Sequence, residues 1–148
     1  MKILAIETSC DETAVSVIEA EGDTEGATYR VLGDALFSQA SMHAEFGGVY
    51  PALAKREHQK NLVPLTIRAL TEADSLRKEE SEINESAADT IREAEFKADT
   101  LGFLKTHAKP AIDLIVVTKG PGLEPALWTG VTFAESLAST WEKVVTGS

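Results

Sequence analysis

Three short runs of apolar residues dominate the first part of the chain. Residues 2–7 are largely apolar, which suits a strand in a covered sheet, and residues 13–19 are rich in β-branched side chains. The few polar residues between these runs predict an antiparallel hairpin. A polar turn at residues 21–26 leads to a third run at residues 28–38. Together the three runs predict a three-stranded antiparallel meander.

The pattern becomes helical after residue 50. From residue 51 to about residue 73, apolar side chains recur every three or four positions, which predicts an amphipathic helix. Pro64 removes one backbone hydrogen bond within it and predicts a kink. Residues 76–105 also show helical, heptad-like spacing. Ser86 resembles an N-cap, so this stretch is either one helix or two helices joined near Asn84.

The last part of the chain alternates strand and helix. Residues 111–118 predict a buried strand, a glycine-containing turn ends it, and residues 125–141 predict a helix. Val144 and Val145 are expected to open a final strand. Three strands followed by α–β units are typical of an α/β fold with a mixed sheet and helices on its faces. This is the pattern of a ribonuclease-H-like lobe, the building block of actin-like ATPases, which usually hold their ligand between two lobes.

Charge narrows the choice of functions. The chain of 148 residues carries 14 Lys and Arg against 24 Asp and Glu, a formal net charge of −10. An acidic protein does not grip a nucleic-acid backbone unaided, although a nucleic-acid enzyme can take its basic face from a larger assembly. Residues 71–100 hold ten of the acids and four of the bases, and this segment is interpreted as a separate module.

Targeting signals and cysteine usage favour a cytoplasmic location. No apolar run approaches the length of a membrane span. Glu7 and Asp11 interrupt the apolar start of the chain, so we expect no signal peptide and no membrane contact. Cys10 is the only cysteine, which excludes an intrachain disulfide and suits a reducing compartment.

Two polar turns carry the candidate chemistry. Between the first two strands, Ser9 offers a hydroxyl, and Asp11 and Glu12 offer carboxylates that can orient a water, an amine or a metal. Between a later strand and helix, Gly120 and Gly122 allow a ligand to approach the backbone and the helix N-terminus, which favours anions. Each turn alone is also compatible with an ordinary loop that binds nothing.

Other reactive side chains have simpler interpretations. Cys10 has no assignable histidine partner, so we expect a buried or half-buried thiol and not a nucleophile. His43 and Glu45 could share a metal, but a solvated loop is the preferred interpretation. Trp128 and Trp141 are expected in the core or at an interface between lobes.

Three segments in this order resemble one enzyme family, the tRNA N6-adenosine threonylcarbamoyltransferases (TsaD, formerly Gcp). Residues 6–14 match its I-E-T-S-C-D-E-T-A opening without a gap. Residues 43–58 match its H-x-x-Y-G-G-V-x-P-x-x-A-x-R-x-H stretch, with Phe46 in place of Tyr. Residues 118–138 match its T-x-G-P-G-L segment and the helix that follows, with Pro125 where Gly is usual.

The resemblance implies an actin-like enzyme that transfers the threonylcarbamoyl group from threonylcarbamoyl-adenylate to N6 of the adenosine beside the anticodon of tRNA. By the family pattern, Asp11 and Glu12 are the catalytic candidates, and Ser9, Gly120 and Gly122 contact the substrate. The exocyclic amine attacks the carbamoyl carbonyl and AMP leaves, so the reaction needs charge stabilisation and proton removal.

The chain differs from the family pattern in its metal ligands, its length and an insertion. The family uses a divalent metal, iron or zinc, held by a His-x-x-x-His pair and an Asp; no histidine of this chain matches those positions, and no metal ligand is assigned. The second lobe is absent, and residues 75–110 form an acidic helical insertion, interpreted either as a partner-docking arm or as a soluble helical hairpin. Residues 1–148 are therefore expected to be a truncated N-terminal lobe, inactive alone.

The resemblance also implies partners and leaves alternatives open. Other subunits of the threonylcarbamoyladenosine (t6A) complex, including a paralogous actin-like subunit, are expected to bind the enzyme. The chain could instead be that non-catalytic actin-like subunit, although the intact Ser9, Asp11 and Glu12 argue against a pure scaffold. Another actin-like phosphotransferase is a third possibility, which the residues of the hairpin disfavour.

Overall fold

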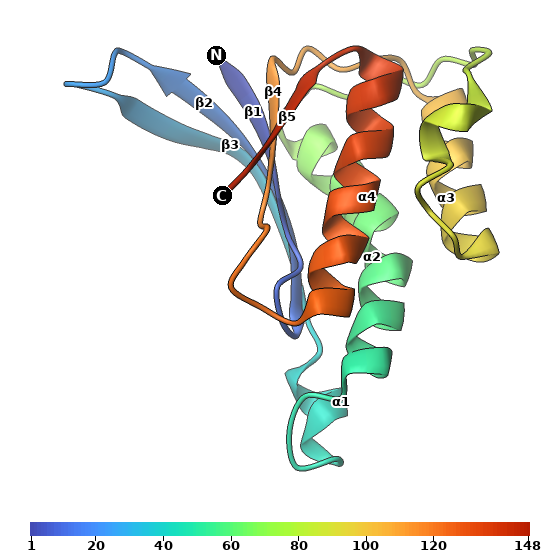
Figure 1. Ribbon diagram of the computed structural model, residues 1–148. Helices are drawn as coiled ribbons and strands as arrows, with labels where there is room; N and C mark the ends of the chain where they lie inside the picture. Colours follow the sequence, from blue (N-terminus) through green and yellow to red (C-terminus); the bar gives the residue numbers. More distant parts are fainter.

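A five-stranded mixed sheet forms one layer of the protein (Figure 1). The computed structural model describes residues 1–148. The strand order is β3-β2-β1-β4-β5; β1, β2 and β3 are antiparallel, and β4 and β5 run parallel to β1. The strands are β1 (Lys2–Glu7), β2 (Glu12–Glu21), β3 (Thr28–Ser38), β4 (Leu114–Val117) and β5 (Val144–Gly147). The predicted meander and the ribonuclease-H-like order are confirmed.

Two long helices pack against one face of this sheet. They are α2 (Pro51–Glu72) and α4 (Glu124–Trp141), and Figure 1 shows both on the same side of the strands. Alternate strand residues point into the layer between sheet and helices and are almost inaccessible: Leu4, Ile6, Val15, Val17, Ile115 and Val117. The helix α2 continues through Pro64, whose side chain is exposed. Both helices were predicted, because a single apolar stripe marks each in the sequence.

The opposite face of the sheet has no helix over it in this chain. Tyr29, Val31, Leu36 and Val144 lie on that face by register, and each is more than half exposed. The expectation of helices on the faces of the sheet therefore holds for one face here. None of the helices has both the length and the apolar character of a membrane-spanning segment.

The acidic segment forms only the second part of the predicted helical structure. Residues 76–84 contain no helix, and backbone hydrogen bonds join residues 77–81 to residues 105–108. One 3₁₀ turn, η1 (Glu85–Ala88), and one helix, α3 (Ala94–Thr106), follow. Asn84 and not Ser86 caps the turn, since its side chain accepts a hydrogen bond from the Ser86 N–H. Long-range backbone pairing overrides the heptad-like spacing in this region.

The segment is part of the hydrophobic core and not a separate module. The helix α3 lies outside α2 and α4, as a third layer (Figure 1). The ring of Phe96 stacks on Phe133 of α4 at a centroid distance of 5.9 Å, and Phe103 meets Trp141 edge-on at 6.2 Å. All four rings are at most 4% exposed. Removing the segment would therefore expose aromatic core residues.

The contact between β3 and α2 leaves no space for a side chain at Gly33. A Cβ atom there would lie 2.0 Å from the carbonyl oxygen of Ala69, within the backbone of α2. We expect Gly33→Ala to lower the free energy of unfolding by about 3 kcal/mol. Gly102→Ala is the matched control, because Gly102 is exposed in α3 with open space around it; it should stabilise by about 0.5–1 kcal/mol. Denaturant unfolding of both variants tests the pair, and equal stabilities would contradict the packing described here.

Candidate functional site

The two predicted site turns meet at one end of the molecule. The hairpin turn, residues 8–11, joins β1 to β2, and the glycine loop, residues 119–123, joins β4 to α4. The Leu123 N–H donates a hydrogen bond of 2.8 Å to the backbone oxygen of Ser9. They meet because β1 and β4 are parallel neighbours, so their carboxyl ends lie at the same edge of the sheet.

This approach is close enough to require glycine in the loop. A Cβ atom on Gly122 would lie 2.5 Å from the backbone oxygen of Ser9 and 2.8 Å from its Cβ. In the second turn of α4, a Cβ on Gly130 would lie 2.5 Å from Thr8 Oγ1. The Thr8 hydroxyl donates a hydrogen bond of 2.7 Å to the carbonyl of Ala126. The hairpin turn is thus fastened along the first turns of α4.

Glu7 fastens the base of the same site. One carboxylate oxygen accepts the Ser9 N–H at 2.5 Å, and the other accepts the hydroxyl of Thr118, just after β4. Burial alone would raise the pKa of Glu7, but the hydrogen bonds from Ser9 and Thr118 outweigh it, so the pKa lies below its usual value. Glu7 therefore carries a negative charge and links the ends of β1 and β4.

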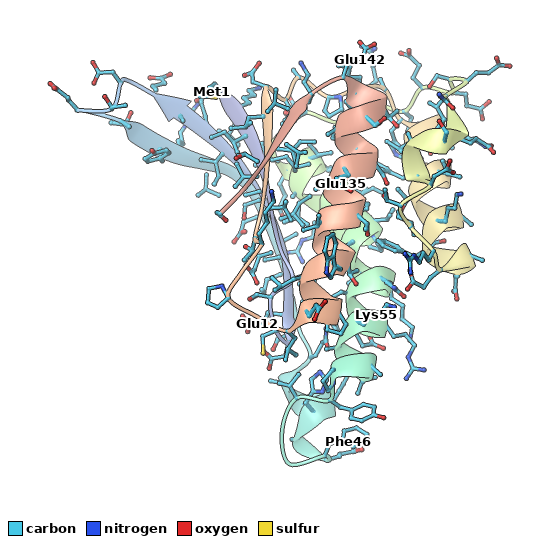
Figure 2. All side chains as sticks on the ribbon, in the orientation of Figure 1. Met1, Glu12, Phe46, Lys55, Glu135 and Glu142 are labelled. Atoms are coloured by element: carbon cyan, nitrogen blue, oxygen red, sulfur yellow. The ribbon has the colours of Figure 1, made fainter.

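The catalytic candidates lie at the tip of the hairpin and form no ion pair with the protein. Glu12 is exposed at the start of β2, and Asp11 is half-buried beside it. Figure 2 shows Glu12 at the lower end of the sheet, where the turn projects. Neither carboxylate takes part in an ion pair. Both are thus available to a ligand at this end of the molecule.

His58 ties α2 to the hairpin turn. Its ring is fully buried, with Nε2 2.9 Å from the carbonyl oxygen of Cys10 and Nδ1 2.7 Å from Thr13 Oγ1. A carbonyl only accepts, so Nε2 carries the proton and Nδ1 accepts from the Thr13 hydroxyl. Burial is the main reason that the pKa of His58 lies below its usual 6.5. A neutral imidazole therefore holds the turn in place.

Protonation of His58 should make stability depend on pH. Its pKa is lowered in the folded state, so the unfolded chain takes up a proton first as the pH falls through 6.5. The free energy of unfolding should then fall by at most about 1.4 kcal/mol per pH unit. The stabilising contribution of Glu7 is lost only below 4.5, so measurements between pH 7 and 5 separate the two groups. His58→Gln should remove this dependence; an unchanged slope in denaturant titrations would disprove it.

Cys10 departs from the expectation of a buried thiol. It is exposed at the tip of the turn. The pKa of its thiol is raised, first because neighbouring atoms partly desolvate the sulfur and then because the carboxylate of Asp11 is adjacent. A raised pKa keeps the thiol protonated at neutral pH and disfavours a nucleophilic role.

The side chains that most often bind metal ions lie apart in this structure. No group of three or more His, Cys, Asp or Glu side chains converges on a common point. His43 is buried, with Nε2 2.7 Å from Gln39 Oε1 and Nδ1 accepting the Tyr50 N–H at 3.1 Å. It is thus neither a loop histidine in solvent nor a ligand with Glu45.

A polar hollow lies away from the two turns. It measures about 580 Å³ between α2, α4 and the turn before α3, and it contains none of the five predicted site residues. Almost all of its lining is polar or charged, including Lys55 and Glu93, with Trp128 at its edge. Small-molecule sites are usually lined by apolar side chains. Trp128 is 57% exposed, whereas Trp141 is buried in the core as expected.

Several residues that shape the site were not identified from the sequence. The family motifs include Glu7, Thr8 and Thr118. The neighbouring sequence does not indicate that their side chains connect the hairpin turn to the segment around the glycine loop. His58 was noted only as the end of a motif. The polar Glu7 at the end of an otherwise apolar strand is the one signal that could have been used.

The fold and the site define a class of protein. A ribonuclease-H-like sheet with a carboxylate-tipped β1–β2 hairpin against a glycine-rich helix entrance is typical of a lobe of the actin-like fold. The tRNA N6-adenosine threonylcarbamoyltransferase (TsaD) family model matches residues 30–84 and 100–147, leaving residues 1–29, 85–99 and 148 unmatched. The chain belongs to this family.

A relative in sequence agrees with this assignment. The chain is 39% identical over 143 residues to a tRNA N6-adenosine threonylcarbamoyltransferase from Persephonella marina. The match covers 97% of this chain but only 30% of that protein. Among solved structures, YeaZ from Pseudomonas aeruginosa aligns with a TM-score of 0.48 at 17% identity, over 99% of this chain and 43% of YeaZ. A second P. aeruginosa structure, described as similar to peptidase YeaZ, gives the same TM-score and identity.

Proposed function

We propose that this lobe supplies the adenylate-facing half of a tRNA threonylcarbamoyl transferase. The contact between Ser9 and Leu123 carries the proposal, because it makes one surface from the hairpin turn and the glycine loop. A surface of this kind offers a hydroxyl, backbone N–H groups and two free carboxylates to one ligand. Such groups match the needs of acyl transfer from an adenylate.

In the proposed reaction, N6 of the adenosine attacks the carbamoyl carbon of threonylcarbamoyl-adenylate. A new C–N bond forms, the bond from that carbon to the phosphate oxygen breaks, and AMP leaves. Glu12 takes the amine proton, and Asp11 orients the amine beside it. The backbone of Gly120 and Gly122 lets the phosphate approach the start of α4, while Ser9 fixes the threonylcarbamoyl end.

The substrates, the location and the partners belong to the same proposal. We infer a cytoplasmic enzyme whose tRNA contacts and metal are completed by other parts of the family-length protein and by further subunits. The chain spans 30% of the length of its Persephonella marina relative. We therefore expect the purified 148-residue chain to form no t6A by itself.

A chimaera tests the proposal directly. The segment of the P. marina protein that matches this chain is replaced by residues 1–148, and the product is incubated with threonylcarbamoyl-adenylate and unmodified tRNA. Mass spectrometry of the digested tRNA should detect t6A with the chimaera and none with the isolated chain. A folded, monodisperse chimaera that forms no t6A would contradict the proposal.

A further inference from the structure

Two aromatic side chains stand out at the end of the protein beyond the hairpin turn. Phe46 and Tyr50 flank the loop between the short helix α1 (Ala40–Ala44) and α2, and they are 60% and 52% exposed. Their rings are stacked, with centroids 5.4 Å apart and an interplanar angle of 21°. Figure 2 labels Phe46 at the far end of the molecule, on the side where Glu12 also lies. Large aromatic rings normally contribute to a core, and these two do not.

The pair is attached to the proposed site by a relay of buried hydrogen bonds. The Gln39 N–H donates to the backbone oxygen of Asp11 at 2.8 Å, and Gln39 Oε1 accepts from His43 Nε2 at 2.7 Å. His43 Nδ1 in turn accepts the Tyr50 N–H at 3.1 Å. Gln39 and His43 are at most 2% exposed. The aromatic pair is therefore held in a fixed position relative to Asp11.

The residues around the pair are less acidic than the rest of the protein. Residues 39–58 carry two bases and two acids, a net charge of zero, while the remainder of the chain carries −10. Lys55 is paired with Glu93, but Arg56 is exposed and unpaired in the second turn of α2. A polyanion therefore meets less repulsion here than the net charge of the whole chain suggests.

We propose that the Phe46–Tyr50 pair is a stacking platform for an unpaired base of the tRNA anticodon loop, next to the adenosine that is modified. The inference rests on the proposed function and adds a substrate contact to it. Proteins recognise RNA loops by stacking splayed bases on aromatic rings, which tolerates any base. Arg56 would neutralise a phosphate of the same loop, and the relay to Asp11 would fix the distance between platform and carboxylates.

Photo-cross-linking of the chimaera tests this placement. An anticodon stem–loop RNA carries 5-iodouridine beside the target adenosine, and peptides are mapped after irradiation. We expect cross-links at Phe46 or Tyr50. Trp128→Ala is the control, because Trp128 is equally exposed but lies on α4, and it should leave the cross-links unchanged. Cross-links confined to Trp128, or none at the tip at saturating RNA, would overturn the inference.

Binding of the same RNA provides a second measurement. In the chimaera, the double variant Phe46→Ala/Tyr50→Ala should bind the RNA about tenfold more weakly by fluorescence anisotropy. The Phe46→Tyr variant should bind the RNA as tightly as the unchanged chimaera. Both rings are exposed, so thermal melting should be unaltered. Equal affinities of the double variant and the unchanged protein for the RNA would overturn the inference. A copurifying protein that covers Phe46 and Tyr50, without RNA cross-links at either residue, would overturn it as well. If the chimaera makes t6A and its Phe46→Ala/Tyr50→Ala variant binds RNA normally, this inference alone is refuted. If the chimaera binds RNA at Phe46 and Tyr50 but makes no t6A, the proposed function alone is refuted.

Discussion

Glu12→Gln is expected to lower the turnover number for t6A formation by about 10²- to 10⁴-fold in the chimaera, with little change in the Michaelis constant for tRNA. The amide keeps the shape of the side chain but cannot take a proton from the attacking amine. Because Glu12 is exposed and forms no ion pair, the substitution should not affect folding. The loss would therefore report on chemistry and not on stability.

The matched control for this variant is Glu25→Gln. Glu25 is an exposed acid in the turn between β2 and β3, and its neutralisation changes the net charge equally. It should leave turnover unchanged. Steady-state kinetics with quantified t6A separates the two variants, and a Glu12→Gln chimaera as fast as the control would remove Glu12 from the reaction.

Gly122→Ala is expected to cost about 10²-fold in the same assay while changing the melting temperature little. The added Cβ would overlap the backbone of Ser9, so the glycine loop must move away from the hairpin turn. The loop is exposed and can move without unfolding the core. A displacement of the order of 1 Å separates the groups that bind and activate one ligand.

Gly26→Ala is the control for the glycine substitution. Gly26 lies in a distant exposed turn with open space around it, so its variant should retain full activity and stability. If Gly122→Ala also retained activity, the close contact between the two turns would have no part in the reaction.

The order of the strands and the meeting of the two turns could both be predicted from the sequence. The apolar runs of β1, β2 and β4 are local signals, and a parallel β1–β4 pair necessarily brings its two carboxyl ends together. The motifs at residues 6–14 and 118–138 mark those same ends. Local pattern and topology therefore agree at the place that the proposed function uses.

The acidic segment could not be predicted, for a physical reason. Its extended part, residues 77–81, is held by backbone hydrogen bonds to residues 105–108, and such pairing leaves no periodic trace. The spacing of Leu76 and Ile83 suits a helix, yet both side chains pack on the core from a non-helical backbone. The partners of Glu7 and His58 escaped prediction likewise, because they lie 111 and 45 residues away along the chain.

The most direct test is a titration of the isotopically labelled 148-residue chain with AMP, the leaving group of the proposed reaction, followed by amide NMR shifts. If one ligand surface spans both turns, the amides of Ser9 and Glu12 and those of Gly120 and Gly122 will shift together along a single binding curve. Shifts at only one of the turns, or two curves with different midpoints, would contradict a shared site.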